Sequence, residues 1–243
     1  MRAALLALIL APGATSALEC RDLEHLGQSF TICEVDLARE RIETFLRDDY
    51  GRILGSFEAV ERAAGGPVLM AMNAGMYHAD RSPVGLYVED GATEQRLIES
   101  AGPGNFGLLP NGVFCVAADG VRIVETRAFA ASERRCDFAS QSGPMLVLDG
   151  ALHPRLIPGG SSRHIRNGVG AGDGRVVFAI SNQPVNFHDF ATLFRDALGL
   201  DDALYFDGKV SRLHVPALGR SDIGLQMGPI VAVRPIDGTA AGD

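Results

Sequence analysis

Alternating apolar and polar positions predict that most of this chain folds as β-strands. Residues 28–35 (QSFTICEV) alternate around Phe30 and Ile32, which is the pattern of a strand with one buried face. Between residues 85 and 124, further alternating runs are joined by short turns, an order typical of antiparallel hairpins. The apolar run PVLMAM is a further predicted strand, and it breaks at Asn73.

Helical patterns occur at two places. In residues 56–66 (SFEAVERAAGG), Ser56 is suited to cap a helix start and the two glycines to end it. A second helix is predicted over 186–199, between a buried strand at 175–181 and a short strand at 203–206. Strand, helix, strand at this spacing is a βαβ crossover, which joins parallel strands. We therefore expect a single α+β domain, with a mixed β-sheet rich in antiparallel hairpins and one βαβ crossover unit.

The dipeptide Asp-Gly occurs six times, and its usual role is a two-residue hairpin turn. The six aspartates are Asp90, Asp119, Asp149, Asp173, Asp207 and Asp237. The first three lie between alternating runs and are predicted turns. Asp207 follows the second strand of the crossover, so it and Ser181-Asn182 are expected at one edge of the sheet, where ligands bind in open α/β sheets. This position favours a functional role for Asp207, with a plain turn as the alternative.

Composition and charge narrow the function. The chain has 243 residues, 47% of them hydrophobic, and a net charge of −8, which indicates a folded protein and argues against nucleic acid or an anionic membrane surface as partner. A local basic pocket is still compatible with Arg163, His164 and Arg166. Neither CxxC nor HExxH spacing occurs, so no metal and no cofactor is expected.

The first 17 residues have one basic residue, a short apolar run and then small residues, which is typical of a secretory signal peptide. The alternative is a buried first helix, but Pro12-Gly13 directly after the apolar run disfavours it. We expect cleavage after Ser16 or Ala17. Residues 18–243 would then form a periplasmic or secreted protein without stable membrane insertion.

Four cysteines follow the predicted signal peptide. An even number in an oxidising compartment suggests two disulfides, for which three pairings exist. Proximity in the sequence favours Cys20–Cys33 and Cys115–Cys136.

Several short motifs in a fixed order resemble the phosphodiester glycosidase family. MNAGMYHADRSPVG resembles the family's Asn-Gly-Gly-Phe-Phe…Pro-x-Gly motif, RNGVG its Arg-x-x-x-Gly stretch, and YFDGKVS its Asp-Gly-Gly-x-Ser motif. The resemblance spans about residues 68–231. Ala74 and Lys209 stand where these motifs have glycine.

The resemblance implies a glycosidase acting on a carbohydrate or sugar-phosphate substrate. Cleavage of a sugar C1–O bond passes through an oxocarbenium-like state that a carboxylate stabilises or attacks, and a departing phosphate requires a cation. Asp207 is therefore assigned as nucleophile or base and Arg166 as the phosphate contact. Residues assigned to substrate binding are Asn73, Gly75, His164, Asn182, Gly208 and Ser211. The alternative function is a non-catalytic cell-envelope module that binds glycan or a phosphorylated polymer with the same groups.

Overall fold

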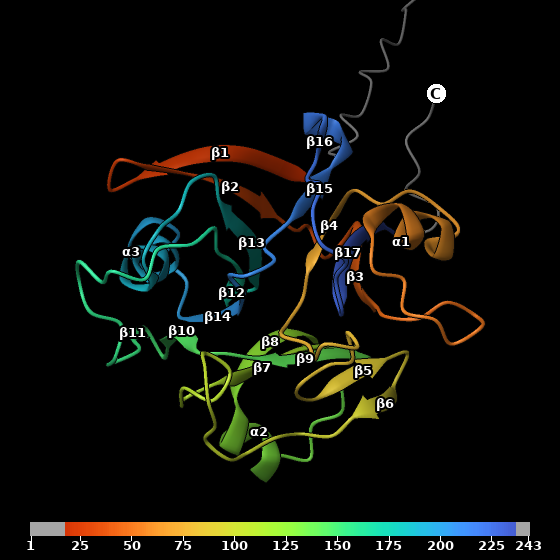
Figure 1. Cartoon of the computed structure of the whole chain (residues 1–243), viewed down its shortest axis with the longest axis horizontal. Helices are drawn as coiled ribbons and strands as arrows, with labels where there is room; N and C mark the ends of the chain where they lie inside the picture. The colour runs from red at the N-terminus through yellow and green to blue at the C-terminus, as the bar shows by residue number, and fades with distance from the viewer. Residues whose placement is uncertain (1–17, 237–243) are drawn as a thin grey trace, which may run out of the picture.

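The computed structural model describes residues 18–236 and arranges three β-sheets around a shared core (Figure 1). The predicted signal peptide and Asp237 lie outside these residues. The largest sheet has seven strands in the order β1-β2-β13-β12-β14-β10-β11. Their bounds are Glu19–His25 (β1), Gln28–Glu34 (β2), Arg175–Ser181 (β13), Asn167–Gly172 (β12), Asp202–Asp207 (β14), Met145–Leu148 (β10) and Ala151–Leu152 (β11).

Two five-stranded sheets complete the fold. One has the order β16 (Arg220–Ser221), β15 (Leu213–Val215), β4 (Met70–Asn73), β17 (Ile230–Pro235) and β3 (Glu40–Phe45). The other has the order β6 (Ala92–Gln95), β5 (Tyr87–Glu89), β9 (Phe138–Ser142), β7 (Gly112–Ala117) and β8 (Gly120–Glu125).

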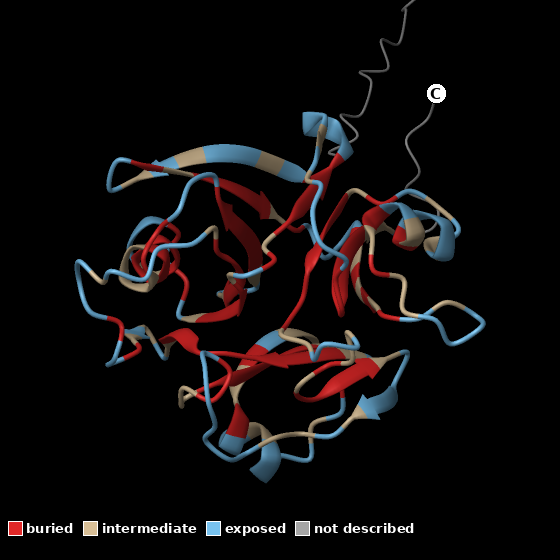
Figure 2. Ribbon diagram, viewed as in Figure 1, coloured by how far each residue is buried: buried red, intermediate tan, exposed pale blue. Residues whose placement is uncertain are grey.

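The main hydrophobic core lies where the three sheets face one another, as the buried inner strands of Figure 2 show. Phe114 of β7 packs edge-on against two rings of the largest sheet, Phe178 at 5.8 Å and Phe206 at 6.0 Å between centroids. Met72 of β4 joins the same cluster. Removing this apolar surface from water stabilises the fold by about 25 cal/mol per Å², so the three sheets hold one another in place.

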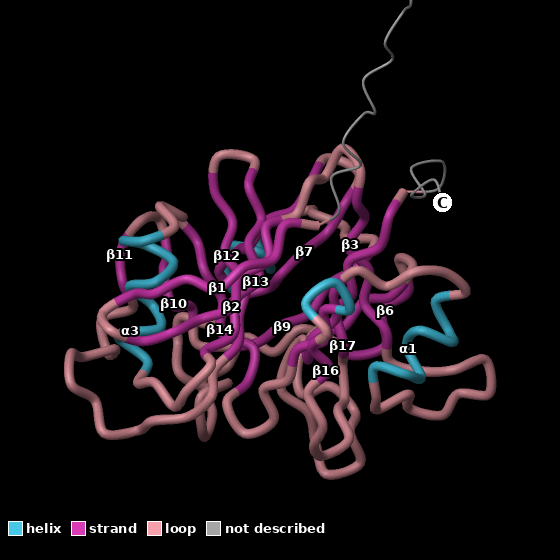
Figure 3. Tube along the Cα trace, turned by 90° about the horizontal axis from the view of Figure 1, so that it is seen from above, coloured by secondary structure: helices cyan, strands magenta, loops and turns pink. Residues whose placement is uncertain are grey.

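Helices cover the outer faces of the sheets. The predicted first helix is α1 (Phe57–Ala64), which the Ser56 hydroxyl caps and Gly65 ends at φ 63°. The predicted second helix is α3 (Phe187–Thr192), which continues as a π-helical turn, η1 (Leu193–Ala197). Figures 1 and 3 place α3 and α1 at opposite flanks of the strands. The remaining short helices are α2 (Thr126–Ala131) and the 3₁₀ turn η2 (Pro216–Leu218).

The Asp-Gly pairs divide as the sequence predicted. Those at Asp90, Asp119 and Asp149 each join two neighbouring strands of one sheet, and Asp173 does the same between β12 and β13. Asp207 instead ends β14, and the chain then passes to β15 in another sheet. It is therefore no hairpin turn.

The predicted crossover from β13 through α3 to β14 is present, with one correction. β12 lies between the two strands and pairs antiparallel with both, so β13 and β14 run in the same direction without touching. Every strand pair within residues 18–236 is antiparallel. The α+β class is thus confirmed, while the expected parallel pairing is absent from the described strands.

Both disulfides pair as sequence proximity favoured. Cys20 and Cys33 are directly opposed on β1 and β2, and Cys115 of β7 is bonded to Cys136 ahead of β9. Within residues 18–236, no helix has the length and apolar character that crossing a membrane requires.

Candidate active site

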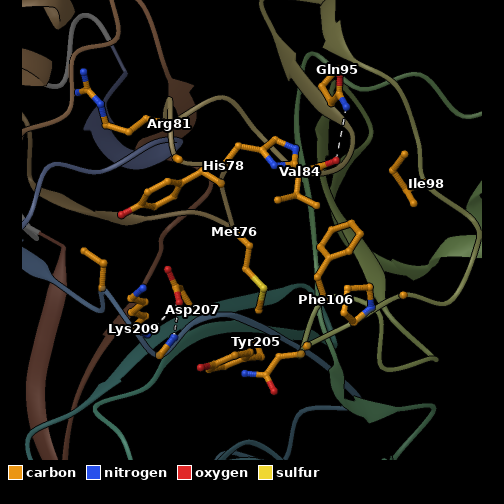
Figure 4. Close-up of a pocket in the computed structure, with 18 of the residues that line it drawn as sticks. Met76, His78, Arg81, Val84, Gln95, Ile98, Phe106, Tyr205, Asp207 and Lys209 are labelled. Carbon is orange, nitrogen blue, oxygen red and sulfur yellow. Dashed lines mark hydrogen bonds between the residues drawn. The ribbon is translucent and has the colours of Figure 1, made fainter.

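A cavity of about 1440 Å³ opens beside the end of β14 (Figure 4). Three segments form most of its wall: the loop after β4, the glycine-rich loop before β7, and the bend at 207–210. Tyr205 and His164 complete the wall on the side of the largest sheet. The cavity therefore lies between elements that are far apart in the sequence.

Asp207 presents its carboxylate to this cavity. Its Oδ1 accepts the backbone N–H groups of Gly208 at 2.6 Å and Lys209 at 2.9 Å, which fixes the orientation of the side chain. Only 9% of the residue is exposed. Burial raises the pKa of the Asp207 carboxyl, while these N–H groups and the charge of Lys209 act in the opposite direction.

Asn167, the first residue of β12, forms hydrogen bonds to strand ends of two sheets, Asp207 of β14 and Asn73 of β4. Its Oδ1 accepts the backbone N–H of Asp207 at 3.2 Å and the Asn73 amide at 3.2 Å. Its own Nδ2 donates to the Asn73 carbonyl at 2.8 Å. Ser211 closes the bend, because its hydroxyl lies 2.7 Å from the Asp207 carbonyl and 2.9 Å from that of Ile165. These buried bonds hold the backbone of the acid in place.

Arg166 lies behind the cavity and does not line it. The residue is fully buried, and its three nitrogens donate to the Val185 carbonyl, the Tyr205 hydroxyl and the Ser162 carbonyl. The guanidinium also lies 3.5 Å from the centroid of the Phe187 ring, a cation–π contact. Each of its three nitrogens thus has a partner in the protein, and the Nη1 bond holds Tyr205 against the cavity wall.

The two tyrosines of the cavity wall are both kept in the neutral form. Burial raises the pKa of Tyr205 well above its usual value. Burial also raises the pKa of Tyr77, to which the nearby Asp207 charge contributes. A neutral phenol donates a hydrogen bond, and Tyr77 uses its hydroxyl on the Gln226 carbonyl at 3.1 Å.

The charge of the cavity wall differs from that of the whole chain. Asp207 is the one acidic residue among the described residues that line it, whereas Arg81 and Lys209 are basic and His78 and His164 are ionisable. A protein with net charge −8 thus lines this cavity with one carboxylate and several basic side chains. This arrangement suits an anionic ligand.

The structure brings most of the predicted site residues together, in two layers. Asp207, Gly208 and His164 line the cavity, whereas Asn73, Arg166 and Ser211 form the buried layer behind it. Gly75 contributes backbone only, and its φ of 142° is one that residues with side chains rarely adopt. It also packs closely on β9, so that an added Cβ would lie 2.7 Å from the Ser140 hydroxyl.

Asn182 follows β13 at the sheet edge where it was expected; the preceding residue, Ser181, is the one that bonds the Arg166 carbonyl, whereas the Asn182 N–H bonds Ser29. Its side chain does not line the cavity and instead bonds Ser29 at 3.0 Å and Arg220 at 2.8 Å. The amide is directed toward the outer strands rather than toward Asp207.

Four important residues were not predicted. Asn167, Tyr77 and Lys209 each lie inside a quoted motif, and Phe106 lies in the glycine-rich loop GPGNFG. The sequence feature that could have identified them is their proximity to the motif residues. The sequence does not show that these side chains lie close together in the fold. Among residues 18–236, no group of three or more His, Cys, Asp or Glu side chains is placed to hold a metal.

A family model and a sequence relative match most of the chain. The family model described as phosphodiester glycosidase matches residues 67–219. The Escherichia coli K12 protein named "Uncharacterized protein YigE" is 40% identical over 179 residues, covering 72% of this chain and 70% of that protein.

Two solved structures share the fold at 14% sequence identity. The zebrafish N-acetylglucosamine-1-phosphodiester alpha-N-acetylglucosaminidase catalytic domain, auto-inhibited by its pro-peptide, superposes with a TM-score of 0.63 over 91% of this chain and 84% of that chain. A hypothetical protein from Synechocystis superposes with a TM-score of 0.50, over 88% of this chain and 61% of that chain.

Proposed function

Because the chain belongs to the phosphodiester glycosidase family, we propose that it is an exported glycoside hydrolase that cleaves a sugar-1-phosphodiester or a related glycosidic bond. The observation that carries this proposal is the position of Asp207, the acid that faces the cavity from a bend fixed by Asn167 and Ser211. Two disulfides fit an exported protein, because such bonds persist in oxidising compartments.

In the proposed reaction Asp207 acts at the anomeric carbon. The C1–O bond breaks, the phosphate leaves with the bonding electron pair, and water supplies the hydroxyl of the free sugar, while the other proton of that water passes to the released phosphate or to solvent. Asp207 either stabilises the positive charge that develops on the sugar ring or forms a bond to C1 that water then breaks. A phosphate leaves as a stable anion, so a second carboxyl group for protonation is not required.

The buried layer has a positioning role in this proposal. We assign Arg166 to holding Tyr205 and the wall around Gly208, in place of the phosphate contact that the sequence suggested, because it is fully buried behind the cavity and each of its three nitrogens donates to the protein. Asn73 and Ser211 likewise fix the bend at Asp207. The groups that line the cavity, including Asp207 and His164, then contact the substrate.

The test is incubation with a panel of sugar-1-phosphodiesters, followed by measurement of free reducing sugar. The wild-type protein is expected to release sugar from at least one member. Asp207→Asn should lower turnover by about 100-fold or more, the scale for loss of an acid–base or nucleophilic group. Binding of a panel member without release would contradict the proposal and favour the non-catalytic envelope module.

A folded control makes the result interpretable. Burial raises the pKa of Asp207, so at neutral pH the ionised carboxylate makes the folded state less stable relative to the unfolded chain. Asp207→Asn removes the charge and therefore this loss of stability. Its melting temperature at neutral pH should equal or exceed that of the wild type. Asp173→Asn is the matched control, because Asp173 also precedes glycine but forms a hairpin turn outside the cavity, where Asn tolerates φ 50°. Full activity in Asp207→Asn would refute the assignment.

A further inference from the structure

Lys209 is the only lysine in the 243-residue sequence, which has 22 lysine and arginine residues in total. Wherever else this chain places a permanent cation, it uses arginine. The single exception lies two residues after Asp207 and lines the same cavity. Figure 4 shows the two side chains next to each other.

The charge of Lys209 is not neutralised by an ion pair. Its side chain is exposed, and no hydrogen bond or ion pair joins its ammonium group to another described residue. Exposed arginines elsewhere are commonly paired, as Arg47 is with Glu94 at 2.8 Å and Arg52 with Asp48 at 2.7 Å. Near Asp207, the ammonium is thus available to a ligand.

The other basic groups around the cavity are engaged or directed elsewhere. Arg166 is buried and donates to the protein, and Arg212 donates to the carbonyls of Asp222 and Leu225. Arg81 lines the cavity, but its guanidinium extends away from Asp207 (Figure 4), toward Gly55, where an added Cβ would lie 2.5 Å from Nη1. Lys209 is the remaining permanent cation next to the carboxylate.

We propose that the Lys209 ammonium binds the phosphoryl oxygens of the substrate and makes the site select an anionic leaving group over a neutral one. This inference rests on the proposed function and names the residue that distinguishes its substrate class. A lysine on a flexible four-carbon stem follows a phosphoryl group as a mobile point charge. A cation at this position also stabilises the negative charge that accumulates as the C1–O bond breaks.

The kinetic test compares two substrates with the same sugar, one a phosphodiester and the other a neutral aryl glycoside. Lys209→Met should lower kcat/KM for the phosphodiester by about 10- to 100-fold, the scale of a lost charge-assisted hydrogen bond, and leave the neutral substrate within about threefold. Lys209→Arg should retain most of the preference, because it keeps the charge. Arg96→Met is the matched control, since Arg96 is exposed and does not line the cavity. Equal losses on both substrates would overturn the inference.

A second readout does not depend on turnover. An acetylating reagent can modify only two kinds of amine in this protein, Lys209 and the α-amino group, so the terminus serves as an internal reference. In the Asp207→Asn protein, inorganic phosphate should slow acetylation of Lys209 relative to the terminus, as peptide mass spectrometry would show. Protection of Lys209 in this variant, combined with no hydrolysis of any panel member by the wild-type protein, would support the anion site and refute the proposed function. No protection at saturating phosphate would overturn the anion site even if the enzyme is active.

Discussion

The side chain of Asn167 holds the backbone of Asp207 by a 3.2 Å hydrogen bond from the Asp207 N–H to Oδ1. The same oxygen accepts the Asn73 amide, so strand ends of two different sheets meet at one buried atom. The candidate acid is therefore held at the end of β14 by the neighbouring strand β12, and Asn73 of another sheet bonds the same oxygen.

The Asn167 contact predicts a specific loss of activity. Asn167→Ala would leave the Asp207 N–H and the Asn73 amide without their partner, at a cost of about 1–3 kcal/mol for each buried unsatisfied group. We expect lower unfolding free energy in urea and a lower kcat for the phosphodiester. Asn186→Ala is the control: it removes the cap of α3, costing about 1 kcal/mol, away from this network. If both variants lost the same activity, the positioning role of Asn167 would be excluded.

The pH dependence of the reaction should follow the Asp207 carboxyl. Asp207 acts as a carboxylate in the proposal, so kcat/KM falls as the pH drops through its pKa. Because burial raises this pKa, the acid limb should lie at higher pH than the ordinary aspartate value of about 3.9. The Lys209 charge lowers the same pKa, so in Lys209→Met the limb should move to still higher pH. A limb at or below the ordinary aspartate value, in pH–rate profiles of both proteins, would contradict the assignment.

Glycine is required at position 208 because a side chain would clash with Tyr205, and not because of its backbone angle. A Cβ at this position would lie 2.0 Å from the Tyr205 hydroxyl and 3.5 Å from Arg166 Nη1. Gly208→Ala should therefore displace the Tyr205–Arg166 pair, destabilise the protein by about 1–3 kcal/mol and reduce turnover. Gly160→Ala is the control, because its Cβ would meet only ordinary contacts, the nearest at 3.5 Å.

A double-mutant cycle tests whether the clash with Tyr205 is what makes Gly208→Ala destabilising. Tyr205→Phe removes the hydroxyl that the new methyl group would meet, so Gly208→Ala should cost less in the Tyr205→Phe background than in the wild type. Additive losses in thermal unfolding would show that the steric explanation is incorrect.

The Cys115–Cys136 disulfide should contribute more stability than Cys20–Cys33. It closes a chain separation of 21 residues, for which loop-closure entropy gives about 3 kcal/mol. The other bond has a separation of 13 and joins strands that the β1–β2 hairpin already pairs. Paired Cys→Ser variants, compared by urea unfolding, should rank in this order, and the reverse ranking would contradict it.

Local features were readable in the sequence because neighbouring residues decide them. The cap at Ser56, the αL stop at Gly65 and the turns at Asp90 and Asp149 depend on the conformations of a few consecutive residues. The proposal for Asp207 rests on a longer pattern, the strand–helix–strand order over residues 175–207 that places it at the edge of a sheet.

Only the tertiary structure decided how the site is built. Asn73 and Asn167 are 94 positions apart, and their contact exists because the largest sheet and the sheet of β4 share one core. Arg166 is buried by folding, and each of its three nitrogens then donates to one of Val185, Tyr205 and Ser162. The sequence by itself determined the turns, the caps and the favoured cysteine pairs, because these follow from short-range geometry. Long-range packing decided which basic groups are accessible, because it buries Arg166 behind the cavity and leaves Lys209 exposed in its wall.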